Sequence, residues 1–293
     1  MSKSKINTTF LLVIIILSIA SNKCQYSKED CFDLPHTVCG FDKRLIISTL
    51  NKDPSLIAHY TFDDIIPHDE SGNNNEPSGE IGVGPSAIVK GNSAYFNGTQ
   101  MLTIPHSQSF ETKGDLSITF WVYLLEDSTG NWRTILHKGT NIQEMTPTIM
   151  LWPNERRLHV RVGTESVWND GLESNGILNM KQWTHISLVL SGQMMQLYIN
   201  GYLDNQIILK GKIEMNKGDF HIGKDQWHTG AKCYIDEFKI YNRALGKRFI
   251  ESESSLYNTL YNNAYVKLGC KECSFVQALT ACEEGYHMCS YDE

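Results

Sequence analysis

Beyond its first 20 residues, this 293-residue chain lacks any apolar run long enough to cross a membrane. A helical span needs about 20 consecutive apolar residues. The chain also lacks a run of Lys and Arg, and its formal net charge is −7. Nucleic acid and anionic lipid attract the opposite charge. The sequence therefore predicts a protein that has no transmembrane segment after its N-terminus and that does not bind nucleic acid.

The N-terminus carries a strongly apolar segment. Lys3 and Lys5 precede the run FLLVIIILSIA at residues 10–20, which ends in small residues. A basic start, a short apolar run and a small-residue exit are typical of a secretory signal peptide, and we expect cleavage after Ala20. The alternative is an uncleaved signal anchor, for which the run is short. Cleavage removes two Lys and no acid, so the net charge changes from −7 to −9. We expect a secreted protein, extracellular or associated with a cell surface.

Cysteine is scarce in the middle of the chain. Residues 51–255 hold one of the eight cysteines, whereas residues 21–50 hold three and residues 256–293 hold four. A long segment can be stabilised by its own core, but short segments bury too little surface and need covalent support. The middle zone is therefore predicted to be a domain with a hydrophobic core, flanked by disulfide-supported ends.

The middle zone shows the alternation of β-strands. Apolar residues alternate with Ser, Thr, Trp and Tyr at residues 116–124, and similar patterns occur at residues 158–162 and 186–190. Such alternation indicates half-buried strands. The pair Asn200-Gly201 lies between two apolar runs and favours a tight hairpin. Turn signals recur about every 8–12 residues, and no long helix interrupts them, which predicts an all-β antiparallel sandwich.

Seven short segments of the middle zone follow one another in the order found in laminin-G-like domains. They are HYTFDD with DESGN at 59–73, AYFNG with LTIP at 94–105, SITFWV at 117–122, QWTHISL at 182–188, LYING at 197–201, FHIG at 220–223 and YIDEFKIYNRAL at 234–245. Over about residues 55–245 the chain resembles the laminin-G-like, concanavalin A-like lectin and glucanase family. The resemblance implies a jelly-roll β-sandwich with a concave face.

Apolar residues at helical spacing follow the last strand pattern and predict a connecting helix at residues 245–262. The tail after it, with GCKEC at 269–273, resembles the small disulfide modules of secreted protist proteins. The predicted parts of the chain are a signal peptide at 1–20, a cysteine-containing segment at 21–50, the sandwich at 51–245, and the helix with the cysteine-rich tail at 246–293.

The resembled family includes glucanases, which use two carboxylates as acid and nucleophile. Their strand pattern is Glu-x-Asp-x-x-Glu. In the matching stretch YIDEFK, Tyr234 and Lys239 stand where the two Glu would be. Asp236 alone cannot fill both roles. We therefore expect that the protein is not an enzyme.

Asp236 shares strand parity with Phe238 and Ile240, so alternation predicts that it points inward, where a carboxylate needs a partner. Many members of the resembled family hold a structural Ca²⁺ between the first strand, the following loop and the closing strand. Such oxygen ligands suit Ca²⁺. The alternative is that Asp236 accepts hydrogen bonds from loop amides without a metal. The residues at the family's metal positions are Asp63, Asp64, Asp69 and Asp236.

Aromatic residues in predicted loops are the candidates for ligand binding. They are Trp132, Trp168 and the pair Trp227-His228. Exposed aromatic rings stack on sugars or anchor protein partners, although Trp also fills cores well. Asn97 lies in the one sequon of the mature chain, Asn-Gly-Thr, and is the predicted glycosylation site.

The even number of cysteines in an exported chain indicates disulfides. Cys270 and Cys273 also have zinc-knuckle spacing, but export favours disulfides, and we expect the pairs Cys270–Cys282 and Cys273–Cys289. The remaining four include Cys233, so at least one bond is expected to tie this residue to the N-terminal segment. The predicted disulfide residues are Cys24, Cys31, Cys39, Cys233, Cys270, Cys273, Cys282 and Cys289.

These features together predict a secreted adhesion module that binds a glycan or a glycoprotein. The alternative is a structural subunit of a surface assembly that contacts protein partners only. A glycosidase is a third and less favoured reading, because the carboxylate pair is missing.

Overall fold

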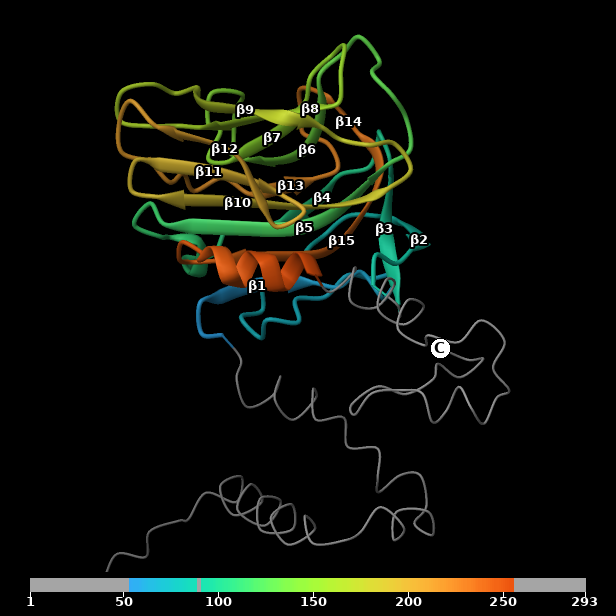
Figure 1. Cartoon of the computed structure of the whole chain (residues 1–293). Helices are drawn as coiled ribbons and strands as arrows, with labels where there is room; N and C mark the ends of the chain where they lie inside the picture. Colours follow the sequence, from blue (N-terminus) through green and yellow to red (C-terminus); the bar gives the residue numbers. More distant parts are fainter. Residues whose placement is uncertain (1–52, 89–90, 256–293) are drawn as a thin grey trace, which may run out of the picture. The chain divides into compact units, whose positions relative to one another are not determined.

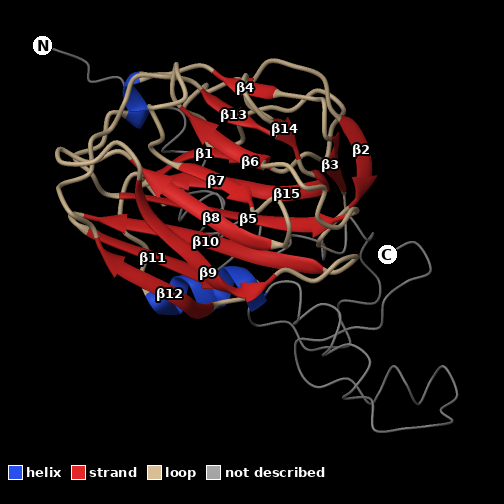
Figure 2. Cartoon of the chain, turned by 90° about the horizontal axis from the view of Figure 1, so that it is seen from above, coloured by secondary structure: helices blue, strands red, loops and turns tan. Residues whose placement is uncertain are grey.

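A computed structural model describes residues 53–88 and 91–255, which form a sandwich of two β-sheets (Figure 1). Neighbouring strands pair antiparallel, with the exception of β14 against β6. Figure 2 shows the sandwich from above, with the strands of one sheet overlying those of the other. The predicted all-β jelly-roll sandwich is confirmed.

One sheet has eight strands. In order across the sheet they are β12 (Tyr202–Ile208), β11 (Met194–Ile199), β10 (Trp183–Ser191), β5 (Leu116–Leu124), β15 (Lys232–Tyr241), β3 (Asn92–Asn97) and β2 (Gly82–Pro85), and β1 (Leu56–Tyr60) also pairs with β15. The chain passes repeatedly between the sheets, so strands far apart in sequence become neighbours. The two central strands, β5 and β15, are separated by more than 100 residues.

The other sheet has seven strands and carries the candidate site. In order they are β4 (Leu102–Ile104), β13 (Phe220–Ile222), β6 (Arg133–Lys138), β7 (Thr148–Leu151), β8 (Arg157–Val162) and β9 (Asp170–Ile177), and β14 (Thr229–Gly230) pairs with β6. A short 3-10 turn, η2 (Gln108–Phe110), follows β4.

The core lies between the two sheets and follows the alternation of the sequence. In β5, the residues predicted to share one face are all buried in the core: Leu116, Ile118, Phe120, Val122 and Leu124. In β8, Leu158 and Val160 point inward in the same way. Because side chains alternate along a strand, the residues between them point outward. The outward residues of β8 are Arg157, His159 and Arg161.

Strand β15 departs from simple alternation. Its pairing with β5 shifts between Asp236 and Lys239, and Glu237 has a φ of 49°. Such a bulge adds one residue and resets the alternation, so that Ile235 and Phe238 both lie in the core. Asp236 pairs with Trp121 instead, on the outer face of the sheet. The prediction that it points inward with Phe238 is therefore wrong.

Residues 247–255 are helical and pack on the outer face of the eight-stranded sheet (Figure 1). Ile250 lies in an apolar cluster with Tyr198 and Tyr241 of that sheet. Lys239 Nζ also lies 2.7 Å from the Glu253 carboxylate. The predicted connecting helix is confirmed over this range, and residues 256–262 lie outside the described residues. Within the described part of the chain, no helix has the length and apolarity of a membrane span.

Candidate functional site

A row of polar residues crosses the outer face of the seven-stranded sheet. Thr103, His221, His137, Thr148 and Arg161 lie directly opposite one another on β4, β13, β6, β7 and β8. Hydrogen bonds join neighbours in this row, with Thr103 Oγ1 3.2 Å from His221 Nδ1 and Thr148 Oγ1 2.9 Å from His137 Nδ1. We call the outward-pointing surface of this sheet the polar face.

Three partly exposed rings gather at one end of the polar face. The ring centroids of Trp132 and Trp152 are 4.8 Å apart, and the His159 ring lies 4.6 Å from Trp132 and 5.5 Å from Trp152. Trp132 immediately precedes β6, and Trp152 immediately follows β7. Because the strands pair with the right register, the three rings meet although they come from three segments. We call Trp132, Trp152 and His159 the aromatic cluster.

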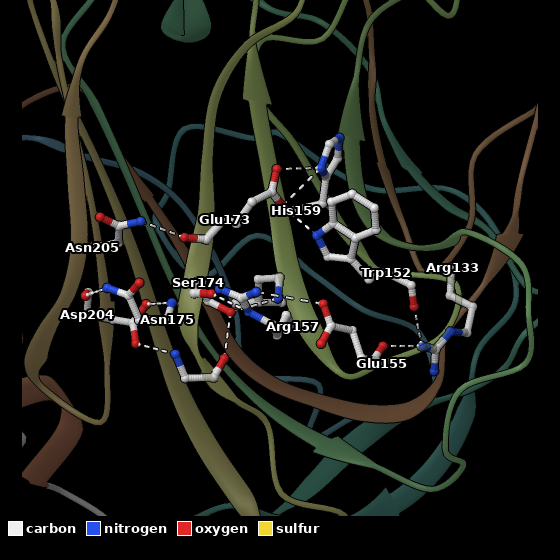
Figure 3. A network of polar contacts seen from close by, with 12 residues as sticks. Arg133, Trp152, Glu155, Arg157, His159, Glu173, Ser174, Asn175, Asp204 and Asn205 are labelled. Atoms are coloured by element: carbon white, nitrogen blue, oxygen red, sulfur yellow. Dashed lines mark hydrogen bonds and ion pairs between the residues drawn. The ribbon is translucent and has the colours of Figure 1, made fainter.

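Glu173 of β9 lies beside two members of the aromatic cluster, Trp152 and His159 (Figure 3). Its carboxylate accepts hydrogen bonds from Trp152 Nε1 at 2.6 Å, from His159 Nδ1 at 3.0 Å, and from an Arg161 Nη atom. Partial burial would raise the pKa of the Glu173 carboxyl, but the hydrogen bonds and the charge of His159 outweigh it and lower the pKa to about 2. Glu173 is therefore a fixed carboxylate that orients two members of the cluster.

Arg133 holds the backbone beneath the aromatic cluster. Its side chain is 1% exposed, and its guanidinium donates to the carbonyls of Asp127, Trp152 and Glu155, each at 2.8 Å. The Asp127 carbonyl belongs to the segment before Trp132, and the other two belong to the turn after β7. Figure 3 shows the contacts of Arg133 with Trp152 and Glu155. One buried cation thus fixes both tryptophan-bearing segments.

A further aromatic ring, that of Trp227, lies beside the middle of the polar face. Trp227 lies 5.1 Å from the His137 ring, and Asp225 fixes its loop by accepting the backbone N–H groups of Trp227 and His228 at 2.8 and 2.5 Å. Asp225 also accepts a hydrogen bond from Thr134 Oγ1 at 3.0 Å. Burial lowers the pKa of His137 to about 4, so its imidazole is neutral near pH 7.

The structure brings together three of the four predicted ligand-binding residues. Trp132, Trp227 and His228 lie on the polar face, whereas Trp168 is 49% exposed in the turn between β8 and β9. That turn is at the opposite end of β8 from Trp152. The sequence reading missed several neighbours of the cluster, although the outward parity of His159 and Arg161 in β8 was an available signal. The missed residues are Arg133, Trp152, His159, Arg161, Glu173 and Asp225.

The four aspartates predicted as calcium ligands are not gathered around one point. Asp69 accepts backbone N–H groups from His59, Ser71 and Asn75 at 2.9–3.0 Å, and Asp63 and Asp64 are exposed. Within residues 53–88 and 91–255, no group of three or more His, Cys, Asp or Glu is placed to hold a metal ion. The donor atoms therefore do not fit one shared cation, and calcium binding stays a prediction.

The contacts of Asp236 agree with the alternative prediction, in which its carboxylate accepts hydrogen bonds from loop amides without a metal. We call this residue the clamp. Its carboxylate accepts hydrogen bonds from Ala87 N at 2.7 Å, Ser86 Oγ at 2.9 Å and Glu237 N at 2.8 Å. Ser86 and Ala87 follow β2, so this side chain joins the edge of the sheet to its closing strand, β15. Burial raises the pKa of Asp236 to about 7, despite the opposing effect of the Ala87 amide.

Cys233 is a free, fully buried thiol, so the predicted disulfide at this residue is wrong. It shares inward parity with Ile235 and lies in the core, 3.6 Å from its hydrogen-bond acceptor Ala231 O. The alternation of β15 places this side chain in the core. The disulfide was predicted from the number of cysteines alone, which carries no information about burial. The other seven cysteines lie outside the described residues. Asn97 is exposed at the end of β3, and its glycosylation stays a prediction.

Comparison with known families gives two matches. A family model described as the concanavalin A-like lectin/glucanases superfamily, of the laminin G type, matches residues 96–250. A domain of unknown function (DUF8019) matches residues 263–293, which lie outside the described residues. Comparison with curated protein sequences gives no match.

Solved structures with this fold include sugar-bound and toxin domains. Domain 4 of AbnA, an extracellular arabinanase from Geobacillus stearothermophilus solved with arabinotriose, is 20% identical, with a TM-score of 0.54 over 68% of this chain and 98% of that chain. The binding domain of Paraclostridial Mosquitocidal Protein 1 is 18% identical, with a TM-score of 0.58 over 72% and 53%. The botulinum neurotoxin DC binding domain, solved with rat synaptotagmin II, is 18% identical, with a TM-score of 0.55 over 73% and 53%. This chain thus spans about half of the two toxin chains, and identities this low show the fold alone.

Proposed function

This chain belongs to the concanavalin A-like lectin/glucanase superfamily, and from that premise we propose that it is a secreted, non-catalytic adhesion module that binds a glycan or a glycoprotein. The observation that carries the proposal is the aromatic cluster of Trp132, Trp152 and His159 beside Glu173. Aromatic ring faces contact the C–H groups of sugars, and a few fixed polar groups orient the ligand. The signal-peptide pattern of residues 1–20 supports export.

The chemistry of Glu173 supports binding rather than hydrolysis. A glycosidase needs a carboxylic acid whose pKa is raised, together with a second carboxylate. The pKa of Glu173 is instead lowered to about 2, and the neighbours that contact its carboxylate are donors: Trp152, His159 and Arg161. A carboxylate held in this way orients rings but cannot deliver a proton near neutral pH.

Other proteins with this fold give the proposal a precedent. The arabinanase domain was solved with arabinotriose, and the botulinum neurotoxin DC binding domain was solved both with synaptotagmin and with SialylT. The fold therefore serves proteins with glycan ligands and proteins with protein partners. For this chain the partly exposed rings of the aromatic cluster favour the glycan.

Substitution of the cluster tests the proposal. We expect a glycan array to identify ligands, and we expect Trp152→Ala and Trp132→Ala each to weaken binding by about tenfold, because each removes one ring contact of about 1.4 kcal/mol. Trp168→Ala is the matched control, since it removes an exposed indole outside the cluster, and it should leave affinity unchanged. Binding that is equally strong in all three variants in calorimetric titrations would remove the polar face as the ligand site.

A protein-only partner is the second candidate function. The side chains of Tyr202 and Ile208 in β12 are more than two-thirds exposed, and large exposed apolar groups favour protein contacts. In that case a native pull-down recovers a partner that still binds Trp152→Ala, and the glycan array stays blank.

A further inference from the structure

We infer that the aromatic cluster selects an uncharged glycan, because the charged side chains beside it are already paired within the protein. This inference rests on the proposed function and names the class of ligand. It follows from three observations on the polar face: the bonds of Arg161, the bonds of Arg157 and Arg156, and the contact between Glu173 and Trp152.

Arg161 is the cation closest to Glu173, and its guanidinium is used internally. Its Nη1 atom donates to the carbonyls of Val160 at 2.9 Å and Leu172 at 3.0 Å, and its Nη2 atom contacts the Glu173 carboxylate. An acidic sugar would have to compete with Glu173 for this group. Breaking the pair would leave a partly buried carboxylate without its cation, which is costly.

The two neighbouring arginines are also engaged. Arg157 donates through Nε to Ser174 O at 2.8 Å and lies 3.8 Å from the Glu155 carboxylate, as Figure 3 shows. Arg156 donates to the Asp127 carboxylate at 2.5 Å and to Leu178 O at 2.9 Å. Each of these guanidiniums is thus paired with a carboxylate, and an acidic glycan that approached them would also come close to the carboxylates of Glu155 and Asp127.

Glu173 also prepares the Trp152 ring for a neutral ligand. The indole N–H donates to the carboxylate at 2.6 Å, a short charge-assisted hydrogen bond. Such a bond increases the electron density of the ring, and the negative ring face attracts the positively polarised C–H groups of a sugar. The same carboxylate repels an acidic substituent. Glu173 is thus a positioning residue that favours uncharged sugars through Trp152.

Matched glycans test the inference. Calorimetric titration compares neutral oligosaccharides with sialylated and sulfated ones of the same length, at about 50 and about 500 mM salt. We expect the neutral ligands to bind at least about tenfold more tightly and their affinity to change by less than about twofold with salt, because no net charge is neutralised on binding. An acidic glycan that binds more tightly, with an affinity that falls as salt rises, overturns the inference.

The variant Glu173→Gln separates selectivity from folding. It removes the charge while keeping the size of the side chain, and we expect weaker binding of the neutral glycan and a shifted Trp fluorescence. Trp168→Ala is the control for binding, and its affinity for the neutral glycan should stay unchanged. Neutral and acidic glycans that bind Glu173→Gln and the wild type alike would also overturn the inference. If acidic glycans bind and depend on Trp152, the inference fails while the proposed function stands. If no glycan of either class binds, the proposed function itself fails.

Discussion

Asp236 shows how one buried carboxylate can join two parts of a sheet. It is 1% exposed and accepts hydrogen bonds from two backbone amides and a serine hydroxyl. Those donors would lose their partner if the carboxylate were removed, and an unsatisfied buried group costs about 1–3 kcal/mol. A clamp of this kind explains why an acid stands at this position without needing a metal.

The pKa of Asp236 predicts how stability changes with pH. Burial raises this pKa from 3.8 to about 7, so between these values the folded state holds a proton that the unfolded state has released. The contribution of Asp236 to the free energy of unfolding therefore falls as pH rises from about 4 to 7. We expect urea unfolding of Asp236→Asn to lack this fall in the free energy of unfolding, because the amide does not titrate.

The control for this measurement is Glu173→Gln, because the carboxyl of Glu173 in the wild type has a pKa lowered to about 2. Glu173 contributes stability above its ordinary pKa of 4.5 that is lost as pH falls toward 2, which is the opposite direction. If the pH profile of Asp236→Asn overlays that of the wild type between pH 4 and 7, the clamp titrates outside this range and the prediction is wrong.

At the scale of elements, the two open sheet edges at β9 and β12 protect each other. Asp204 of β12 accepts the backbone N–H groups of Asn175 at 2.7 Å and Gly176 at 2.8 Å, and Asn175 Nδ2 donates to Asp204 O at 2.6 Å. Figure 3 shows this contact. Unpaired edge strands invite aggregation, so side chains here take the place of a neighbouring strand.

We expect Asp204→Ala to lower the free energy of unfolding by about 1–3 kcal/mol, because two backbone donors of β9 lose their acceptor. The matched control is Gln206→Ala, also in β12, whose exposed side chain makes a single contact with Gln196. Its effect should stay within about 0.5 kcal/mol. Urea titration measures both, and equal stability of the two variants would show that the edge contact contributes nothing.

At the scale of the whole molecule, the core decides which cysteine stays reduced. Cys233 lies between the two sheets with no exposed surface, and burial raises the pKa of its thiol to about 12. A thiol is reactive only as an accessible thiolate. The sandwich therefore shields the Cys233 thiol from disulfide formation.

Alkylation mapping of the unreduced protein tests this shielding. We expect iodoacetamide to leave Cys233 unlabelled in the native protein and to label it once urea opens the sandwich, because unfolding both exposes the thiol and restores its ordinary pKa. Peptide mass spectrometry gives the site of labelling. A peptide in which Cys233 is linked to Cys24, Cys31 or Cys39 would contradict the prediction.

Most of the fold was predictable from local sequence. The alternation of residues 116–124 and 158–162 and the Asn200-Gly201 turn predicted strands and a hairpin that the structure contains. Local patterns fail where an inserted residue changes the face of the sheet to which the following side chains point. The bulge at Glu237 reversed the face of Asp236, because alternation cannot reveal an inserted residue.

The candidate site was only partly predictable. Trp132, Trp227 and His228 were found by residue type, but Trp152, His159 and Glu173 join the site through strand pairing. Their convergence depends on register between segments that share no local pattern.

The sequence by itself determined the strands, the turns, the apolar face of each strand and the absence of the glucanase carboxylate pair, because each of these depends on neighbouring residues. Only the tertiary structure decided that Asp236 is a clamp, that Cys233 is a core thiol, and that Glu173 orients Trp152 and His159. Those outcomes require contacts between distant segments, whose geometry is set when the two sheets pack together.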